Sequence, residues 1–395
     1  MREGWARAAV GDIVTINPSE PPLPTDAPFV PMDAVTAGKR WVSYFESRGT
    51  RSGARARGGD VLFARITPCL ENGKVAQIPR EVSRCGGSTE FIVIRGTEGA
   101  SSEFMYLWAT ASATRKTAES LMTGTTGRQR LSARDLGAME ILLPPVVEQR
   151  RIVDFVASVD AYIAGLEKQA EAARTARNAI LLELLTSGGE DWTVSTIGDL
   201  CEVNPESTGM FAPERVTTYI DLSSVSSDRG ISTELTKGPY AQMPGRARRV
   251  VRESDVLVAT VRPYLRGFAL VPQSLDGEVA STGFTVLRSK PGVCVPEYLW
   301  NVVRTDSFVD YLMSRATGSS YPAVRPDDVA SYSVSTPPIL EQQRIADLAA
   351  SLDDVVSRTE DALTESRLVR KGLLSDLLSG EHEIPESYDK FLGAA

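Results

Sequence analysis

The chain has 395 residues, enough for two or three domains that each bury a core of their own. Its apolar fraction of 42% and charged fraction of 24% are those of an ordinary globular protein, and no run approaches the roughly 18 apolar residues of a membrane span. Residues 1–15 lack the apolar centre of a secretory signal, and the four cysteines form no Cys-x-x-Cys pair. We therefore expect a cytoplasmic protein with reduced thiols, no membrane association and no zinc site.

The net charge of −8 is unevenly distributed along the chain. Residues 39–134 contain 16 basic and 8 acidic residues, residues 237–266 contain 7 and 2, and residues 337–395 contain 6 and 12. The two basic regions are expected if one face of each meets a phosphate backbone, although charged stretches are also common on solvated surfaces.

The predicted elements occur in the same order in each half of the chain. In residues 1–143, β-branched and aromatic residues predict strands at 61–65 and 91–95, followed by a helix over about 103–122. A long helix is predicted within 144–189. In residues 190–336 the strands fall at 256–260 and 284–288 and the helix at 296–315, before a second long helix within 337–381 and a tail over 382–395. The predicted fold class is α+β, with two mixed α/β domains.

An internal duplication underlies this order. Residues 144–188 and 337–381 align without a gap and are identical at 16 of 45 positions, where about three identities are expected from average residue usage. The preceding domains match more loosely, as in Asp60-Val-Leu-Phe-Ala with Asp255-Val-Leu-Val-Ala and Ser88-Thr-Glu-Phe with Ser281-Thr-Gly-Phe. The second copy therefore begins about 193 residues after the first.

Both long segments carry a heptad seam of apolar residues, spaced alternately by four and three. A proline pair precedes each segment, and Gly188 and Gly380 end them, so each helix should have about 38 residues and a length of roughly 55–60 Å. A single helix of this length cannot bury its own stripe, so we expect an antiparallel coiled coil that joins the two domains about a pseudo-twofold axis. The alternative is that each helix folds back onto its own domain. The seam residues are Ile152, Val156, Val159, Ile163, Leu166, Ala170 and Ala173, and Ile345, Ala349, Leu352, Val356, Thr359 and Leu363.

Motifs for catalysis are missing from the sequence. It has no phosphate-binding loop, no Gly-x-Gly-x-x-Gly motif, no histidine-based metal motif and no Asp/Asn-Pro-Pro-Tyr/Phe motif of adenine methyltransferases. Asp60 with Glu71 and Lys74 could be interpreted as nuclease ligands, but the second half keeps only Asp255, which favours a structural role. We predict no catalytic residues, no metal site and no cofactor in this chain.

Motifs at the ends of the long helices carry a family resemblance. With them the chain resembles, over nearly its whole length, the specificity subunits of type I restriction-modification systems. The motifs are Leu143-Pro-Pro-Val-Val-Glu-Gln149, Thr336-Pro-Pro-Ile-Leu-Glu-Gln342, Leu181-Leu-Glu-Leu-Leu-Thr-Ser187, Leu373-Leu-Ser-Asp-Leu-Leu-Ser-Gly380 and Gly124-Thr-Thr-Gly-Arg-Gln-Arg-Leu-Ser132.

The resemblance implies a non-catalytic subunit that reads double-stranded DNA with a bipartite target. Residues 1–143 and 190–336 would be two target recognition domains, and the helices in 144–189 and 337–381 would space them and dock two methyltransferase subunits; residues 382–395 would be a tail. Partner subunits would methylate adenine at N6 with S-adenosylmethionine. Restriction and translocase subunits that use ATP and Mg²⁺ would cut unmodified DNA.

Candidate DNA-contacting residues follow from the chemistry of base edges, since Arg pairs with guanine and Gln with adenine. In the second domain Ser-Ser-Tyr replaces the Arg-Gln-Arg of the first, so we expect its half-site to be read by different chemistry. For each arginine, the alternative is a solvated surface charge. The candidates are Arg65, Thr67, Lys74, Arg128, Gln129 and Arg130 in the first domain, and Thr260, Arg262, Tyr264, Ser319, Ser320, Tyr321 and Arg325 in the second.

Candidate partner-binding residues lie off the seams, because each long helix has more apolar surface than one seam uses. These are Phe155 and Tyr162 on the first helix and Leu348 and Val355 on the second. Three other functions remain open: a specificity subunit of a fused restriction-methylation enzyme that cuts beside its split site, a coiled-coil protein that binds no DNA, and a self-contained enzyme.

Overall fold

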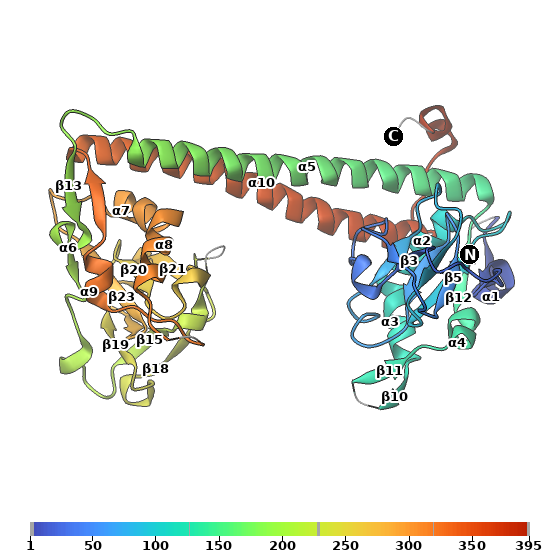
Figure 1. Ribbon diagram of the computed structural model, residues 1–395, viewed down its shortest axis with the longest axis horizontal. Coiled ribbons are helices and arrows are strands. Elements are labelled where there is room, and N and C mark those ends of the chain that lie inside the picture. The colour runs from blue at the N-terminus through green and yellow to red at the C-terminus, as the bar shows by residue number, and fades with distance from the viewer. Residues whose placement is uncertain (1–3, 126, 227–229, 319, 393–395) are drawn as a thin grey trace. The chain divides into compact units, whose positions relative to one another are not determined.

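The computed structural model describes residues 4–125, 127–226, 230–318 and 320–392 (Figure 1). Its internal contacts divide the chain into two units, Met1–Lys168 with Asp361–Ala395 and Gln169–Glu360. The two long helices are α5 (Val146–Thr186) and α10 (Ile339–Ser379). Both are a few residues longer than predicted, and each begins in one unit and ends in the other.

The first unit contains two four-stranded sheets. The strands of the antiparallel sheet, in spatial order, are β2 (Thr15–Ile16), β9 (Phe91–Arg95), β6 (Val61–Ala64) and β7 (Val75–Gln77). The second sheet has β4 (Glu46–Ser47), β3 (Pro28–Val30), β8 (Cys85–Gly87) and β5 (Ala54–Ala56), with β3 and β8 parallel. Around them lie β1 (Ala6–Ala9) paired with β12 (Glu140–Leu143), the hairpin of β10 (Thr123–Thr125) and β11 (Arg128–Arg130), and helices α1 (Val10–Ile13), α2 (Ser102–Thr110), α3 (Ser112–Ser120) and α4 (Ala133–Ala138).

The second unit repeats the strand order of both four-stranded sheets. Its antiparallel sheet has the order β14 (Cys201–Val203), β23 (Phe284–Ser289), β20 (Val256–Ala259) and β21 (Phe268–Leu270). Its other sheet has β18 (Thr236–Pro239), β15 (Val216–Ile220), β22 (Val279–Ser281) and β19 (Ala247–Val250), again with the two middle strands parallel. The smaller elements are β13 (Thr193–Thr196) paired with β24 (Ser333–Thr336), β16 (Val225–Ser226) paired with β17 (Gly230–Ile231), and helices α6 (Ile197–Leu200), α7 (Pro296–Val303), α8 (Asp306–Arg315) and α9 (Pro326–Ala330). The predicted α+β fold with two duplicated domains is confirmed.

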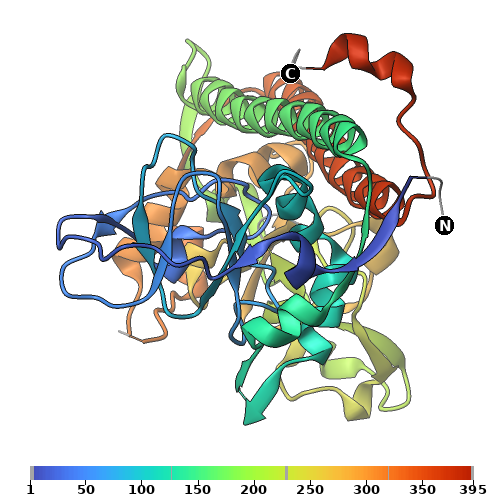
Figure 2. The same cartoon turned by 90° about the vertical axis from the view of Figure 1, so that its right-hand side faces the viewer.

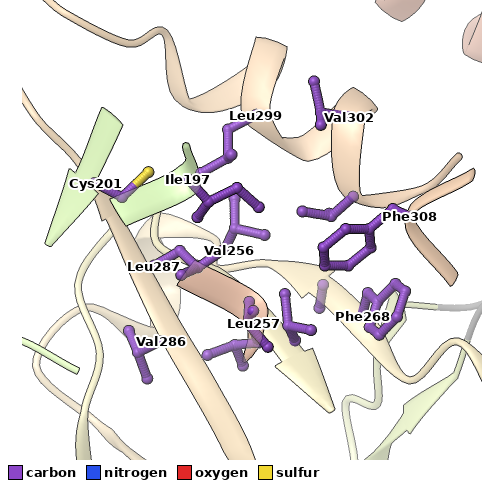
Figure 3. Packing of buried hydrophobic residues seen from close by; sticks show 14 of the residues in the cluster. Ile197, Cys201, Val256, Leu257, Phe268, Val286, Leu287, Leu299, Val302 and Phe308 are labelled. Carbon is purple, nitrogen blue, oxygen red and sulfur yellow. The ribbon is translucent and has the colours of Figure 1, made fainter. Parts of the chain in front are cut away.

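The larger core of each domain lies between the antiparallel sheet and the helices that follow its central strand, and in the first unit a second buried cluster joins residues of both sheets. In the second unit every residue of β20 is buried, and Phe308 of α8 packs edge-on against Phe268 of β21 with ring centroids 5.9 Å apart (Figure 3). The equivalent strand β6 is buried along its whole length in the first unit. Short, fully buried runs of β-branched and aromatic residues therefore form the central strands, as predicted.

Each helix predicted after the central strands is in fact two helices. In the first unit the hydroxyl of Thr110 donates to the carbonyls of Tyr106 and Leu107, and Ala111 adopts an extended conformation between α2 and α3. In the second unit the hydroxyl of Thr305 accepts a hydrogen bond from Phe308 N and caps the start of α8. Threonine side chains that bond the local backbone thus end or start a turn inside an otherwise helical pattern.

Within each unit, α5 and α10 run antiparallel. In their ion pairs, the residue number on α10 falls as the residue number on α5 rises. Every seam residue predicted from the heptad pattern is buried or partly buried. In the first unit Asp160 pairs with Arg370 and Glu167 with Arg367 at 2.7 Å; in the second, Arg177 pairs with Asp353 at 2.8 Å and Arg174 with Glu360 at 2.6 Å. These eight residues occupy four positions of the repeat, each identical in both copies. Each pair in one unit therefore has a sequence-equivalent counterpart in the other.

A buried glutamine joins the start of each long helix to its domain. Gln149 donates to the carbonyls of Gly99 and Pro144 and accepts from Ser101 N, all at 2.8–3.0 Å. Gln342 does the same with Val293, Pro337 and Val295, at 2.9–3.1 Å. The recurrence of Glu-Gln after the proline pairs thus has a structural reason: its amide satisfies three backbone groups that burial would otherwise leave unpaired.

Candidate nucleic-acid interface

The predicted loop residues of the first unit form the β10–β11 hairpin, which projects at the end of the unit away from α5 (Figures 1 and 2). Gly124 and Gly127 both have positive φ, and a side chain at Gly124 would collide with the carbonyl of Arg128. Glycine is therefore required at Gly124 for the two strands to approach each other. The turn places Arg128 in an exposed position at the tip.

Three hydrogen bonds hold this hairpin against the end of strand β6. Gln129 N donates to the hydroxyl oxygen of Thr67, Thr67 N donates to the carbonyl of Gln129, and both distances are 3.1 Å. Leu131 N donates to the carbonyl of Arg65 at 2.8 Å. The structure thus brings together five of the six residues predicted in the first domain: Arg65, Thr67, Arg128, Gln129 and Arg130.

Lys74 is the sixth predicted residue, and its ammonium group is already engaged. Its backbone lies beside Ala64, but Nζ donates to the carbonyl of Met32 at 3.0 Å. One of its three donors is therefore committed to the protein, and the side chain is only partly exposed. This contact limits its reach toward DNA.

Arg130 is held by a residue that the sequence analysis missed. Its guanidinium donates to both carboxylate oxygens of Glu90, at 2.8–3.1 Å. The hydrogen bond from Arg130 lowers the pKa of Glu90, and the nearby charge of Arg65 adds to this effect. A local difference could have revealed this residue, because Glu90 stands in Ser88-Thr-Glu-Phe where the otherwise matching Ser281-Thr-Gly-Phe has Gly283.

In the second unit the equivalent loop pairs with the end of β20 in the same way. Val324 N donates to the carbonyl of Thr260 at 2.9 Å, as Leu131 N does to Arg65. Arg262 N donates to the carbonyl of Pro322 at 2.7 Å, and the Arg262 guanidinium lies 4.3 Å from the ring centre of Tyr321. Arg262 has φ +51°, a backbone conformation that is uncommon outside glycine and is often found at binding sites.

Exposure separates the predicted residues of the second domain. Tyr264, Ser320, Tyr321 and Arg325 are exposed, with Tyr321 at 66%. Thr260 corrects the prediction, because it is only 7% exposed and its hydroxyl donates to the carbonyl of Gly283 at 2.8 Å. Its side chain therefore stabilises the strand end and is not free to contact a base. Ser319 lies outside the described residues.

The aspartates considered as nuclease ligands form structural ion pairs in both units. The carboxylate of Asp60 is almost fully buried, accepts two hydrogen bonds from Arg95 at 2.7–2.8 Å and caps Arg57 N. Asp255 makes the same contacts with Arg288 and Arg252 N at 2.8–2.9 Å. Within the described ranges no group of three His, Cys, Asp or Glu side chains could hold a metal ion.

Comparison with known proteins shows which family has this architecture. The family model for the type I restriction modification DNA specificity domain matches residues 3–173 and 189–365, in two copies that together cover most of the chain. The chain belongs to this family. The relatives that the chain matches are named specificity subunits. These names agree with the prediction of a non-catalytic component.

The matched relatives come from bacteria and an archaeon. The chain is 24% identical over 168 residues to the HindI specificity subunit of Haemophilus influenzae, which is 42% of this chain and 36% of the relative. It is 27% identical over 197 residues to the EcoEI specificity subunit of Escherichia coli, covering 47% and 33%. A putative MjaX specificity subunit of Methanocaldococcus jannaschii is 20% identical over 345 residues, covering 82% and 78%. The chain thus spans about a third of the length of the first two.

Solved structures from type I restriction-modification systems share the fold. A chain from a study of complex assembly and conformational transition of the type I restriction-modification system has a TM-score of 0.65 at 18% identity, covering 95% of this chain and 98% of that one. A type I S subunit from M. genitalium has a TM-score of 0.53 at 12% identity, covering 95% and 96%. In the part of the chain that the structure describes, no helix is long and apolar enough to cross a membrane.

Proposed function

We propose that this chain reads a bipartite double-stranded DNA target, with one half-site for each domain, and that partner subunits act on the DNA it selects. The observation that carries the proposal is the duplicated loop junction. In both units the equivalent loop is hydrogen-bonded to the equivalent strand end. The loop carries Arg128, Gln129 and Arg130 in one copy and Ser320, Tyr321 and Arg325 in the other. A common frame with unlike polar side chains suits two domains that read different base sequences.

We further propose that the helix pair docks two methyltransferase subunits through the off-seam residues. Tyr162, Leu348 and Val355 are exposed apolar or aromatic side chains, between 44% and 62% accessible. Methylation of adenine at N6 with S-adenosylmethionine, and ATP- and Mg²⁺-dependent cleavage by restriction subunits, then belong to the partners. Single-molecule sequencing of methylated adenines in the host genome tests the DNA-reading proposal, since a split motif is expected and an unbroken motif would contradict it.

Docking is tested by purification of the assembled complex. Replacing Tyr162, Leu348 and Val355 by aspartate should abolish complex formation on a sizing column while leaving the variant folded by circular dichroism. A complex that still forms at full strength would place docking elsewhere. Purification of the wild-type complex also separates two versions of the proposal, because it yields either separate methyltransferase and translocase subunits or one fused polypeptide.

Spacing of the half-sites is tested by shortening both helices. Seven residues correspond to two helical turns and about 10 Å, or roughly three base pairs of DNA. Deleting one heptad from α5 and one from α10 keeps the seams in register, so we expect a shorter spacer and unchanged half-site sequences. A change in either half-site sequence would show that reading and spacing are not separable.

A further inference from the structure

The segment after α10 returns to α5 within the first unit. Gly380 ends α10 with φ +77°, and Ile384 is buried in the core cluster of this unit. The chain then forms a short 3-10 helix, η7 (Glu386–Phe391), beside the first turns of α5 (Figure 1). We refer to residues 386–392 as the tail helix.

Three kinds of contact hold the tail helix on α5. The carboxylate of Asp389 accepts two hydrogen bonds from Arg151, at 2.6 and 2.8 Å. The hydroxyl of Tyr388 donates to the carboxylate of Asp154 at 2.9 Å, and its ring packs edge-on against Phe155 with centroids 6.0 Å apart. Phe155, one of the four predicted partner-binding residues, is therefore covered by a segment of the same chain.

The equivalent face of α10, in the second unit, has the same Arg and Asp, and no segment among the described residues covers it. Arg344, Asp347 and Leu348 occupy the repeat positions of Arg151, Asp154 and Phe155, and the Arg and Asp are identical. Side-chain exposure of Arg344 is 78%, and Leu348 is 44% exposed. Among the described residues, only Glu341 is ion-paired with Arg344, at 3.4 Å. One of two like faces is thus occupied and the other is open.

We propose that the tail helix is a built-in competitor for partner docking on α5, so that the two halves of the chain bind their methyltransferase subunits unequally. The first subunit binds the open α10 face, and the second binds α5 only after displacing the tail helix. The partner segment for each face presents an aromatic hydroxyl beside a carboxylate, as Tyr388 and Asp389 do. This proposal rests on the proposed docking function.

The physical basis is the population of the uncovered state. If the tail helix covers α5 nine-tenths of the time, the apparent Kd of a partner for that face rises about tenfold over its intrinsic value. The competitor is tethered through residues 381–385, so its effective concentration is in the millimolar range and it need not bind tightly to be effective. The α10 face bears no such penalty.

Titration of the full chain with the purified methyltransferase subunit, followed by native mass spectrometry, tests the proposal. The wild-type chain should bind two copies in two steps of different affinity. In a chain that ends at Pro385, which keeps Ile384 in the core, the weaker step should tighten about tenfold and approach the stronger one. The double variant Tyr388→Ala, Asp389→Ala should do the same without any truncation. If both variants leave the two steps unchanged, or weaken either one, the tail helix is not a competitor.

Two controls separate this proposal from the docking proposal on which it rests. In Arg344→Ala, Leu348→Asp the stronger step should be lost and the weaker one kept; if both steps remain as in wild type, the docking surface itself is wrong. A synthetic peptide of residues 386–392 should bind the Pro385-terminated chain, and Arg151→Ala should abolish this binding. The peptide measurement needs no partner, so absence of binding at millimolar peptide would overturn the competitor role even if docking is correct.

Discussion

The two recognition loops differ much more than the sheets and helices that carry them, which we call the frame of each unit. In the first unit the loop is charged, and Glu90 holds Arg130 in a two-point ion pair. In the second unit Gly283 stands in place of Glu90, where a side chain would collide with Leu222, and Arg262 stacks on Tyr321 instead. Both loops are nevertheless fixed by the same backbone hydrogen bond to the end of the central strand.

This contrast shows which residues the duplication has kept and which it has changed. The buried glutamines, the Asp–Arg pairs under the central strands and the ion pairs between α5 and α10 recur at matched positions. The changed positions include the recognition loops, although many positions of the helix seams also differ, as at Leu166 and Thr359. The retained residues named above position the structure, and the changed loop residues are the ones available to determine specificity.

The largest expected effect is on the frame and should be equal in the two units. Asp60→Ala and Asp255→Ala each leave a partly buried arginine without its main partner, which should lower the free energy of unfolding by about 3–5 kcal/mol. Urea denaturation measures the loss, and hydrogen exchange shows which unit it affects. Glu98→Ala, at an exposed position, is the control and should change stability by less than about 0.5 kcal/mol. If the free energy of unfolding falls by less than about 1 kcal/mol for only one of the two variants, the two domains do not depend equally on this ion pair.

Loop substitutions should have effects confined to one half-site. Gln129→Ala should relax discrimination at one base position of the first half-site by about 1–3 kcal/mol, because a two-point base contact is lost. Tyr321→Ala removes the ring on which Arg262 stacks and should relax the second half-site only. Methylome sequencing of cells that carry each variant measures both. A variant that alters the opposite half-site would contradict the assignment of one half-site to each domain.

A smaller effect is expected from releasing Arg130. Glu90→Gln keeps the shape of the side chain but loses the charge that orients the guanidinium, and this ion pair is partly exposed to solvent. We therefore expect discrimination at the first half-site to fall by no more than about fivefold. Competition binding with single-base variants of the site measures it. If Glu90→Gln is as damaging as Gln129→Ala, Glu90 itself contacts the DNA.

The smallest expected effect concerns pH and the ion pairs of the helix pair. Asp353 meets both Arg177 and Arg304, whereas Ser112 stands at the position of Arg304 in the first unit. Burial alone would raise the pKa of Asp353, but hydrogen bonds and charge from Arg304 and Arg177 outweigh it and hold this pKa below its ordinary value of 3.8. The stabilisation is therefore complete above the pKa of the unfolded carboxyl and is lost as pH falls through the folded one.

Asp353→Asn provides the measurement for this effect. The free energy of unfolding should depend less steeply on pH below about 4 in this variant than in the wild-type chain, because the shifted carboxyl is gone. Denaturation at several pH values gives both slopes. Equal slopes would show that the ion pair contributes no pH-dependent stability.

The sequence alone determined the duplication, the two long helices and their seams, and the order of the domains' main strands. These features depend on local periodicity and on repeated motifs such as Pro-Pro followed by Glu-Gln. Both can be read directly from the sequence. The seam from Ile152 to Ala173 was predictable because a heptad spacing forces its residues onto one face of a helix. The sequence also indicated that the charged Arg128-Gln-Arg of the first domain is replaced by the uncharged Ser-Ser-Tyr in the second.

Only the tertiary structure decided which of the predicted side chains are free. The side chain of Thr260 is hydrogen-bonded to Gly283, that of Lys74 to Met32 and that of Arg130 to Glu90. Each partner lies between 23 and 42 residues away in the chain. Phe155 is covered by Tyr388, 233 positions further along. Hydrogen bonds and ring contacts between such distant residues depend on how the sheets and helices pack, and periodicity carries no information about them.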